Sequence, residues 1–370
     1  MHSYAEYVSP GHPDRLADAI AEGLVTEALK QRPDALVGVE VAVHRDLVFI
    51  DGRIAAGANP VDTYSLVRDV YAAAGYGGAW IPDPAKLRIV EDLCEEALPE
   101  LEADIRPFSD DQNLVIGYAC RSEVTNHLPT AHWVAGELGR RLFETVRKQP
   151  EWASLFGPDF KILASLHERP DGVTWDRLVL SILHRPGLGH EAQHRRLLPE
   201  LLQILGELEA GGLSGVASNF DPRKLVLNGA GEFAIGGPEG DNGLSGKKLV
   251  IDHYGPLIPI GGGAITGKDP HKIDKCGALR ARQLAKRLVK DGAEEARVTL
   301  GWAPGGDAPF LVEAVTTAGG VTLRLPREEL PEAEWFSISR IVRDLELTER
   351  DWRAALLDGF FAQRTHPWER

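Results

Sequence analysis

Residues 261–274 read GGGAITGKDPHKID, in which three successive glycines precede two lysines. Because glycine has no Cβ, the backbone here can approach a ligand closely and present bare N–H groups. Asp269 and Pro270 predict the N-cap and the first residue of a helix. Lys268 and Lys272 would then lie at a helix N-terminus, where two ammonium groups and the helix dipole favour a bound polyanion.

Two other interpretations of this stretch stay open. Gly262, Gly267 and Lys268 satisfy the G-x-x-x-x-G-K pattern of a P-loop. A P-loop continues with Ser or Thr, whose hydroxyl binds Mg²⁺, whereas this chain continues with Asp269. A plain glycine-rich turn in front of a surface helix would also explain the pattern. The combination of glycines and lysines favours a phosphate site of a different kind.

The rest of the chain alternates between strand and helix patterns. Val250 and Ile251 predict a strand that leads toward the glycines. Asp51 and Gly52 follow an early strand and form a pair typical of hairpin turns. The acidic segment 85–97 is expected to be a helix. The alternation recurs about three times at roughly 110 to 120 residues, which indicates three similar α+β units.

Two further segments carry residue types suited to phosphate or metal binding. Residues 236–248 read GGPEGDNGLSGKK, five glycines and then Lys247 and Lys248. Near the N-terminus, His12 can donate to a phosphate oxygen or act as an acid or base, and Asp14 can hold a divalent cation. Asp14 is equally consistent with an ordinary acid in the first turn of a helix, where it complements the dipole.

Two charged residues lie on predicted strands. Glu40 lies between Val39 and Val41 in an alternating apolar run, so its carboxylate either faces solvent or points into a site. Lys161 opens a strand after a turn, which would fix its ammonium group near the edge of a sheet.

The composition is that of a globular protein with two or three domains: 370 residues, 43% hydrophobic and 26% charged. A net charge of −14 argues against a nucleic-acid partner. The three cysteines, Cys94, Cys120 and Cys276, lie far apart and predict a reducing compartment. No apolar run reaches the roughly 18 residues of a membrane span, and no signal peptide is evident. We therefore expect a cytoplasmic protein without a membrane or nucleic-acid partner.

Three motifs, in the same order, resemble the S-adenosylmethionine synthase family. GGGAITGKDPHKID is similar to the family's GGGxFSGKDPxKVD, GHPDR at 11–15 to GHPDK, and IGGPEGDNGLSGKK at 235–248 to IGGPxGDxGLTGRK. The resemblance covers nearly the whole chain. It implies an α+β fold of three similar α/β units in a pseudo-threefold arrangement, which we expect to occupy residues 1–100, 107–230 and 231–370.

The resemblance also implies a chemistry. In this family the methionine sulfur attacks C5′ of ATP and displaces tripolyphosphate, which is hydrolysed to phosphate and pyrophosphate. Since the leaving group is a polyanion, cations already in place should supply most of the barrier reduction. The implied catalytic residues are His12, Lys161 and Lys268. The implied contacts to ATP and its phosphates are Asp111, Asp159, Ser181, Phe233, Lys247, Lys248, Ala264 and Lys272.

The same resemblance implies cofactors and partners. Asp14 and Asp274 match the Mg²⁺ carboxylates, and Glu40 matches a K⁺ ligand. The implied substrates are ATP and L-methionine or a related thioether. A homodimer, or a dimer of dimers, with shared active sites is expected.

The departures from the family pattern concern the amino-acid substrate more than the triphosphate. Arg53 occupies the place of a glutamate that would hold the methionine ammonium group, so the charge there is reversed. Asp241 could take over that ammonium group. Trp302 stands where the family has a small aliphatic residue beside the substrate, and Lys247 replaces an arginine, so a point charge replaces a bidentate fork. The segment between Leu98 and Asp111 is shorter than the family's mobile loop.

Two classes of function are consistent with these residues. The first is an adenosyltransferase acting on methionine or on a different thioether. The second is a homologue that does not synthesise S-adenosylmethionine and only binds ATP or cleaves tripolyphosphate. Retention of the phosphate-side lysines and of both metal aspartates favours the first.

Overall fold

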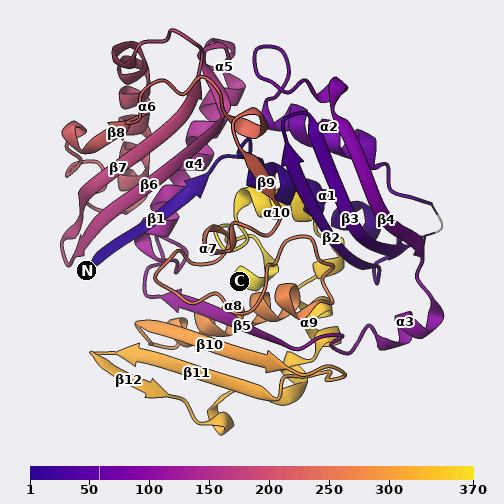
Figure 1. The fold of residues 1–370 in the computed structure, drawn as a ribbon. Helices are drawn as coiled ribbons and strands as arrows, with labels where there is room; N and C mark the ends of the chain where they lie inside the picture. The colour runs from indigo at the N-terminus through magenta and orange to yellow at the C-terminus, as the bar shows by residue number, and fades with distance from the viewer. Residues whose placement is uncertain (58) are drawn as a thin grey trace.

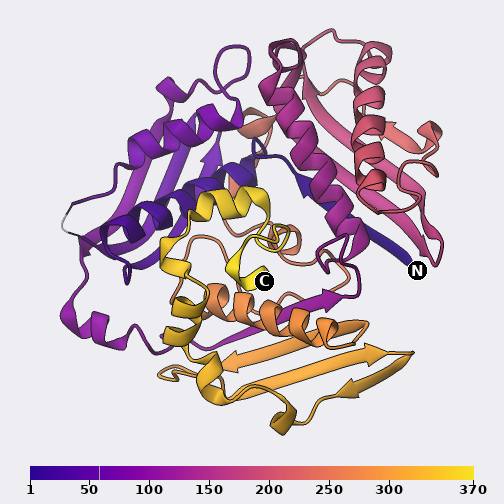
Figure 2. The ribbon, with the colours of Figure 1, turned by 180° about the vertical axis from the view of Figure 1, so that it is seen from behind.

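The computed structural model describes residues 1–57 and 59–370. Three four-stranded sheets lie around a common centre in a roughly threefold arrangement (Figure 1). Seen from behind, helices cover the other face of the sheets and meet near the C-terminus (Figure 2). The predicted α+β class with three similar units is confirmed.

The sheets have the following strands, in spatial order. The first contains β1 (His2–Val8), β6 (Phe156–Arg169), β7 (Gly172–His184) and β8 (Leu225–Leu227). The second contains β4 (Arg88–Ala97), β3 (Leu47–Ala56), β2 (Leu36–His44) and β9 (Asn242–Leu244). The third contains β12 (Val321–Arg324), β11 (Leu311–Ala318), β10 (Glu295–Trp302) and β5 (Asn113–Cys120).

Each sheet is covered by its own helices. The helices α4 (Thr130–Lys148), α1 (Pro13–Gln31) and α8 (Ile273–Lys290) pack on the first, second and third sheets. Beside them, α5 (Pro150–Leu155) and α6 (His190–Ala210) pack on α4, α2 (Thr63–Ala74) on α1 and α9 (Ile338–Asp344) on α8. The short helices are α3 (Glu100–Ile105), α7 (Leu249–Asp252) and α10 (Trp352–Asp358). Within the described part of the chain, no helix has the length and apolar character needed to cross a membrane.

The three units exchange strands. β1 pairs with β6, β5 pairs with β10, and β9 pairs with β2. Each predicted segment, 1–100, 107–230 and 231–370, therefore donates one strand to the sheet of another segment. The sheets do not coincide with contiguous segments, and the three boundaries stay a prediction.

Helices α1 and α8 lie at the centre because their apolar residues face inward. Leu16, Ile20 and Leu24 of α1 are fully buried, as are Leu279 and Ala281 of α8. Burial of a leucine or isoleucine side chain stabilises the fold by about 1.5 to 3 kcal/mol. The N-termini of these two helices are consequently held on rigid elements, and both carry predicted site residues.

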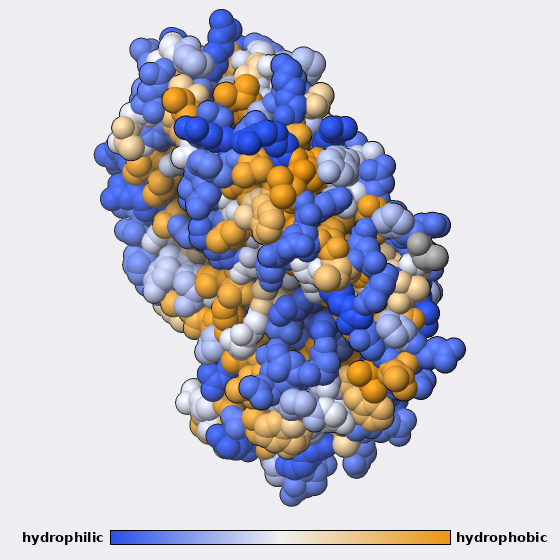
Figure 3. Space-filling model, turned by 45° about the vertical axis from the view of Figure 1, so that its right-hand side comes forward, coloured by the Kyte–Doolittle hydropathy of each residue, from blue (hydrophilic) through white to orange (hydrophobic). Residues whose placement is uncertain are grey.

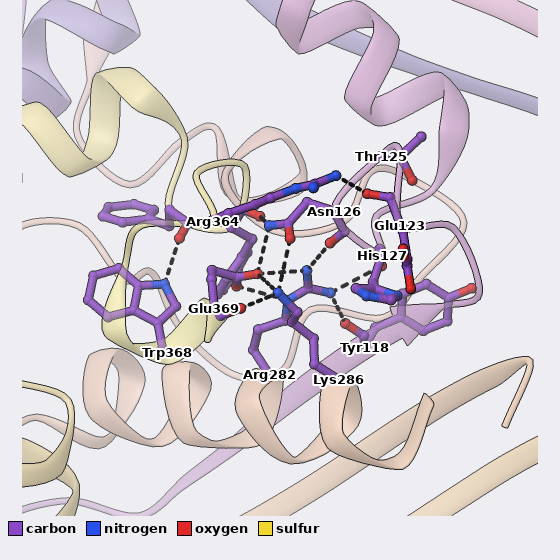
Figure 4. A network of polar contacts seen from close by, with 12 residues as sticks. Tyr118, Glu123, Thr125, Asn126, His127, Arg282, Lys286, Arg364, Trp368 and Glu369 are labelled. Atoms are coloured by element: carbon purple, nitrogen blue, oxygen red, sulfur yellow. Dashed lines mark hydrogen bonds and ion pairs between the residues drawn. The ribbon is translucent and has the colours of Figure 1, made fainter. Parts of the chain in front are cut away.

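A polar network fixes the C-terminal end of the chain to α8 and β5 (Figure 4). The Glu369 carboxylate accepts from Arg282 at 2.9 Å, from Lys286 at 2.9 Å and from Asn126 at 2.8 Å. Arg282 also donates to the carbonyl oxygen of Tyr118 at 2.6 Å. All the side chains that bind Glu369 are buried, so each charge depends on its partner.

Two local predictions were wrong near the second sheet. Segment 85–97, predicted as a helix, is mostly strand β4, which pairs in parallel with β3 at the edge of the sheet. Its acidic residues favour a helix locally, but an edge strand accepts exposed charges. The pairing with β3 therefore determines that the segment is a strand. The predicted turn at Asp51 and Gly52 lies inside β3, and the hairpin turns instead at Arg45, whose φ is 53°.

Two predictions close to the glycines were also wrong. Val250 and Ile251 belong to helix α7, not to a strand. Helix α8 begins at Ile273, so Asp269 and Pro270 precede it, and the N-cap residue is Lys272. Asp269 is drawn away by a different set of partners, described below.

Candidate functional site

His12 is the N-cap residue of α1 and is only 2% exposed. Its Nδ1 accepts a hydrogen bond from the Asp14 amide at 3.2 Å, so the ring proton of the neutral form lies on Nε2. Burial, together with the charge of Lys161, lowers the pKa of His12 to about 3. The 3.8 Å contact between Nδ1 and the Asp14 carboxylate is therefore no ion pair. His12 is suited to donate a hydrogen bond rather than a proton.

Asp14 connects the start of α1 to the loop at 236–248. Its carboxylate accepts from the Leu244 amide at 3.0 Å, binds Lys248 at 2.6 Å and lies 3.7 Å from Lys247. Burial alone would raise the pKa of Asp14, but Lys248 and the Leu244 amide outweigh it and lower the pKa. The carboxylate thus stays charged and holds both lysines of this loop at α1.

Strand β6 supplies the second side of the same loop. Asp159 is 6% exposed and accepts from the Gly237 amide at 2.7 Å, while burial raises the pKa of Asp159 to about 6. Lys161 lies two residues further on, between Val8 of β1 and Ser181 of β7. The prediction that Lys161 opens a strand was wrong, because β6 already begins at Phe156. Lys161 and Asp241 both influence the pKa of Asp159. The structure therefore brings these residues close to His12 and Asp14.

Gly261 and Gly262 lie against Leu114 and Asn113 of β5, whereas Gly263 lies beside Asp274 in the first turn of α8. A Cβ on Gly263 would lie 1.8 Å from the Asp274 carboxylate, so any other residue there would displace that carboxylate. The same carboxylate oxygen binds Lys268 at 2.9 Å. A Cβ on Gly246 would lie 3.1 Å from Cβ of Ala264, so the two glycine-rich loops are adjacent.

Asp269 locks the second loop to the sheet instead of capping α8. It is fully buried and accepts from the Val37 amide at 2.9 Å and the His271 amide at 2.9 Å. It also forms an ion pair with Arg106. Burial would raise the pKa of Asp269, but His271 and Arg106 lower it. Arg106 was not predicted from the sequence, since an arginine in an irregular acidic segment gives no local signal of a buried partner.

The remaining predicted phosphate and adenosine residues lie around this core. Lys272 forms an ion pair with Asp110. Asp111 accepts from the Gln112 amide at 2.7 Å. The Phe233 backbone makes two hydrogen bonds with His184, whose distances are 2.9 and 3.0 Å.

The predicted amino-acid residues are not gathered at one point. Arg53 binds Glu96 at 2.5 Å and Glu102 at 2.8 Å, and these three groups carry a net charge of −1. Trp302 is 1% exposed and packs in the core against Gly277. Among the described residues its indole nitrogen has no hydrogen-bond partner. The side chain of Asp241 accepts from the Asn242 amide.

The predicted metal ligands offer carboxylate oxygens, the donors that Mg²⁺ prefers. Asp14 and Asp274 each hold a lysine ammonium group, so each can bind a cation. Within residues 1–57 and 59–370, no group of three or more His, Cys, Asp or Glu side chains could hold a metal. The pair therefore fits Mg²⁺ only if substrate phosphates complete its coordination. Glu40 accepts from the Ser245 hydroxyl at 2.5 Å and offers one carboxylate for K⁺.

A neutral histidine, lysines paired with carboxylates and two adjacent glycine-rich loops are features suited to binding a polyphosphate, as in nucleotide-dependent enzymes. Residues 2–94 match the N-terminal domain of S-adenosylmethionine synthetase, and residues 235–370 match its C-terminal domain. The chain belongs to the S-adenosylmethionine synthase family, whose members are transferases and generally use metal ions.

Individual relatives agree along nearly the whole chain. The S-adenosylmethionine synthase of Deinococcus deserti is 30% identical, with 99% of this chain and 95% of the relative covered. That of Treponema pallidum (strain Nichols) is 30% identical, with 99% and 93% covered. The fold is shared with a solved structure of an unusual S-adenosylmethionine synthetase from Campylobacter jejuni: the TM-score is 0.82 at 24% identity, and 100% of this chain and 97% of that chain are covered.

Proposed function

We propose that this protein transfers the adenosyl group of ATP to the sulfur of L-methionine, giving S-adenosylmethionine, phosphate and pyrophosphate. One observation carries the proposal: the lysines of two adjacent glycine-rich loops, Lys247, Lys248 and Lys268, are each close to a carboxylate. A tripolyphosphate can replace these carboxylates as the partner of the lysines. The family membership supports the same reaction.

The chemistry follows from the charge that develops. The methionine sulfur attacks C5′, the C5′–O bond breaks, and its electron pair goes to the tripolyphosphate oxygen. Lys161, Lys248 and Lys268 would stabilise the negative charge on the departing group. Neutral His12 would donate its Nε2–H to a phosphate or leaving oxygen. Mg²⁺, held by Asp14 and Asp274, would supply further positive charge, and K⁺ near Glu40 is proposed as the second cation.

For the amino-acid end, we propose that the charge cluster of Arg53, Glu96 and Glu102 replaces the single glutamate of the family. Its net charge of −1 equals that of one carboxylate. Glu102 could then attract the methionine ammonium group in competition with Arg53. Asp241 stays the alternative, and Trp302 is proposed to limit the space beside the substrate.

A homodimer is proposed from the exposed face of the second sheet. Leu244, Ala42, Phe49 and Val90 lie opposite one another on β9, β2, β3 and β4, and so form an apolar row across the sheet. Leu244, Phe49 and Val90 are 46%, 37% and 49% exposed. Figure 3 shows such hydrophobic residues at the surface among hydrophilic ones. Light scattering on the purified protein and on Phe49→Lys checks this: a wild-type monomer would contradict it.

Three free cysteines support the cytoplasm as the compartment.

The activity is tested by incubating the protein with ATP, Mg²⁺, K⁺ and a panel of thioethers, with products identified by mass spectrometry. We expect S-adenosylmethionine from methionine, and none in excess chelator. Lys161→Ala and Lys268→Ala should each lower turnover by about a hundredfold or more. Lys30→Ala, at an exposed ion pair on α1, is the matched control and should leave turnover unchanged. Tripolyphosphate cleavage without any adenosylated product would reject the proposal.

A further inference from the structure

One face of α1 carries four side chains that each accept a hydrogen bond from a backbone N–H distant in sequence. The acceptors and donors are Asp14 with Leu244 (3.0 Å), Asp18 with Gly246 (2.8 Å), Glu22 with Gly267 (3.1 Å) and Thr26 with Trp352 (3.0 Å). Residues four apart lie one above the other on a helix, so the acceptors form a row. The first three reach the strand β9 and the two glycine-rich loops, whereas Thr26 reaches the start of α10.

Asp18 and Glu22 have no place in the chemistry proposed above, although both are fully buried. Each also faces a cation: Arg15 lies 3.3 Å from Asp18, and Lys275 binds Glu22 at 2.7 Å. Burial raises the pKa of both carboxyl groups, so their charged forms are costly inside the protein. The two carboxylates neutralise these buried cations. Their hydrogen bonds to the Gly246 and Gly267 amides are a second role, which charge neutralisation alone does not require.

The two loops need such anchors because glycines leave them many conformations. Gly246 and Gly267 have φ values of +68° and +79°, in the region that favours glycine. Gly246 directly precedes Lys247 and Lys248, and Gly267 directly precedes Lys268. A hydrogen bond to either glycine amide therefore fixes the backbone from which a predicted phosphate lysine extends. Because both acceptors belong to α1, the two loops are also fixed relative to each other.

We propose that Asp18 and Glu22 are positioning residues that hold the two glycine-rich loops in register, so that the lysines of both meet one polyphosphate. The inference rests on the proposed function, because it presupposes that Lys248 and Lys268 bind phosphate. Neither residue touches the substrate. By restricting the loops before any ligand binds, the two residues reduce the conformational entropy that the loops lose on binding.

The test measures binding of inorganic tripolyphosphate with Mg²⁺ by isothermal titration calorimetry, at a temperature where every variant is folded. Asp18→Ala and Glu22→Ala should each raise the Kd by about tenfold, as loss of one hydrogen bond implies. Thr26→Val is the matched control: it removes an acceptor from the same row but not from a glycine loop. We expect it to lower the melting temperature and to leave the Kd within about twofold.

Conservative variants separate the hydrogen bond from general stability. Asp18→Asn keeps an oxygen for the Gly246 amide but places its nitrogen toward Arg15, so it should lose stability and keep most of the affinity. Equal Kd values for wild type and Asp18→Ala would overturn the inference, as would an equal loss in Asp18→Asn or in Thr26→Val. If the wild type itself does not bind tripolyphosphate, the proposed function fails first.

Hydrogen exchange on the unmodified protein covers the case in which Asp18→Ala does not fold. The Gly246 and Gly267 amides should exchange slowly before any ligand is added, because their acceptors are already in place. Exchange at the rate of an unprotected amide would show that the loops are not fixed in advance and would contradict the inference.

Discussion

His12 shows how a single residue's environment selects its chemistry. Its pKa is lowered, from an ordinary 6.5 to about 3, by burial and by Lys161. Since the folded pKa lies below the unfolded one, His12 contributes stability above pH 6.5 that is lost as the pH falls toward 3. We predict that the imidazole stays neutral, with its proton on Nε2, from pH 5 to 8.

Nitrogen NMR of the histidine-labelled protein measures this directly. The His12 signals should stay constant over that range, while a His12→Gln variant identifies them by their loss. A titration midpoint near the ordinary value would contradict the neutral state and would restore His12 as an acid.

The charge of Arg53 is expected to affect which amino-acid substrate the protein prefers. Its guanidinium binds Glu102 and Glu96, and these two glutamates raise its pKa. Arg53→Gln should free Glu102 for the methionine ammonium group. We predict that the ratio of kcat/KM for methionine to that for its des-amino analogue rises. The rise should be about tenfold for each 1.4 kcal/mol of interaction free energy gained between Glu102 and the ammonium group.

The matched control for Arg53→Gln is Arg88→Gln, an exposed arginine of β4 in the same sheet that is paired with Asp46. It should leave the ratio unchanged. An unchanged ratio in Arg53→Gln would place the cluster outside the substrate pocket.

At the scale of elements, the pairing of β2 with β3 depends on one glycine. Gly52 has a φ of +121°, and a Cβ there would lie 2.1 Å from the Gly38 carbonyl oxygen. Gly292 has nearly the same φ, +122°, but nothing within 4 Å. We predict that Gly52→Ala lowers the free energy of unfolding by several kcal/mol, and that Gly292→Ala lowers it by only the strain of its φ, about 1 to 3 kcal/mol.

Urea denaturation of both variants gives the comparison. The difference between them isolates the steric contact with Gly38, because the backbone strain is shared. Equal losses in the two variants would mean that β2 and β3 can separate enough to accept a Cβ.

At the scale of the whole molecule, the C-terminus completes the buried centre. Glu369 neutralises Arg282 and Lys286, and all three side chains are at most 3% exposed (Figure 4). We predict that Glu369→Ala lowers the free energy of unfolding by about 3 to 5 kcal/mol, because it leaves two buried cations unpaired.

Thermal and urea unfolding of this variant provide the measurement. Glu346→Ala, which breaks an exposed pair with Arg350, is the control and should cost at most about 1 kcal/mol. If Glu369→Ala lowers the free energy of unfolding by less than about 1 kcal/mol, water or another acid replaces the carboxylate.

The sequence by itself determined the features that local patterns encode. The glycine-rich loops, the amphipathic helices α1 and α8 and the order of the three motifs were enough to predict an α+β fold of three units and the family. Some of the residues expected at the site lie together, since Asp14 meets Lys247 and Lys248 and Lys268 meets Asp274, and their roles stay a prediction.

Only the tertiary structure decided features that depend on partners far along the chain. Segment 85–97 is helical by composition, but pairing with β3 makes it a strand. Asp269 fits a helix cap locally, but Arg106 and the Val37 amide hold it elsewhere. Asp18 was not among the residues predicted from the sequence, because the Gly246 amide that it binds lies 228 residues away. Local sequence records backbone preference, whereas the burial of charge and the pairing of strands are fixed only when distant segments meet.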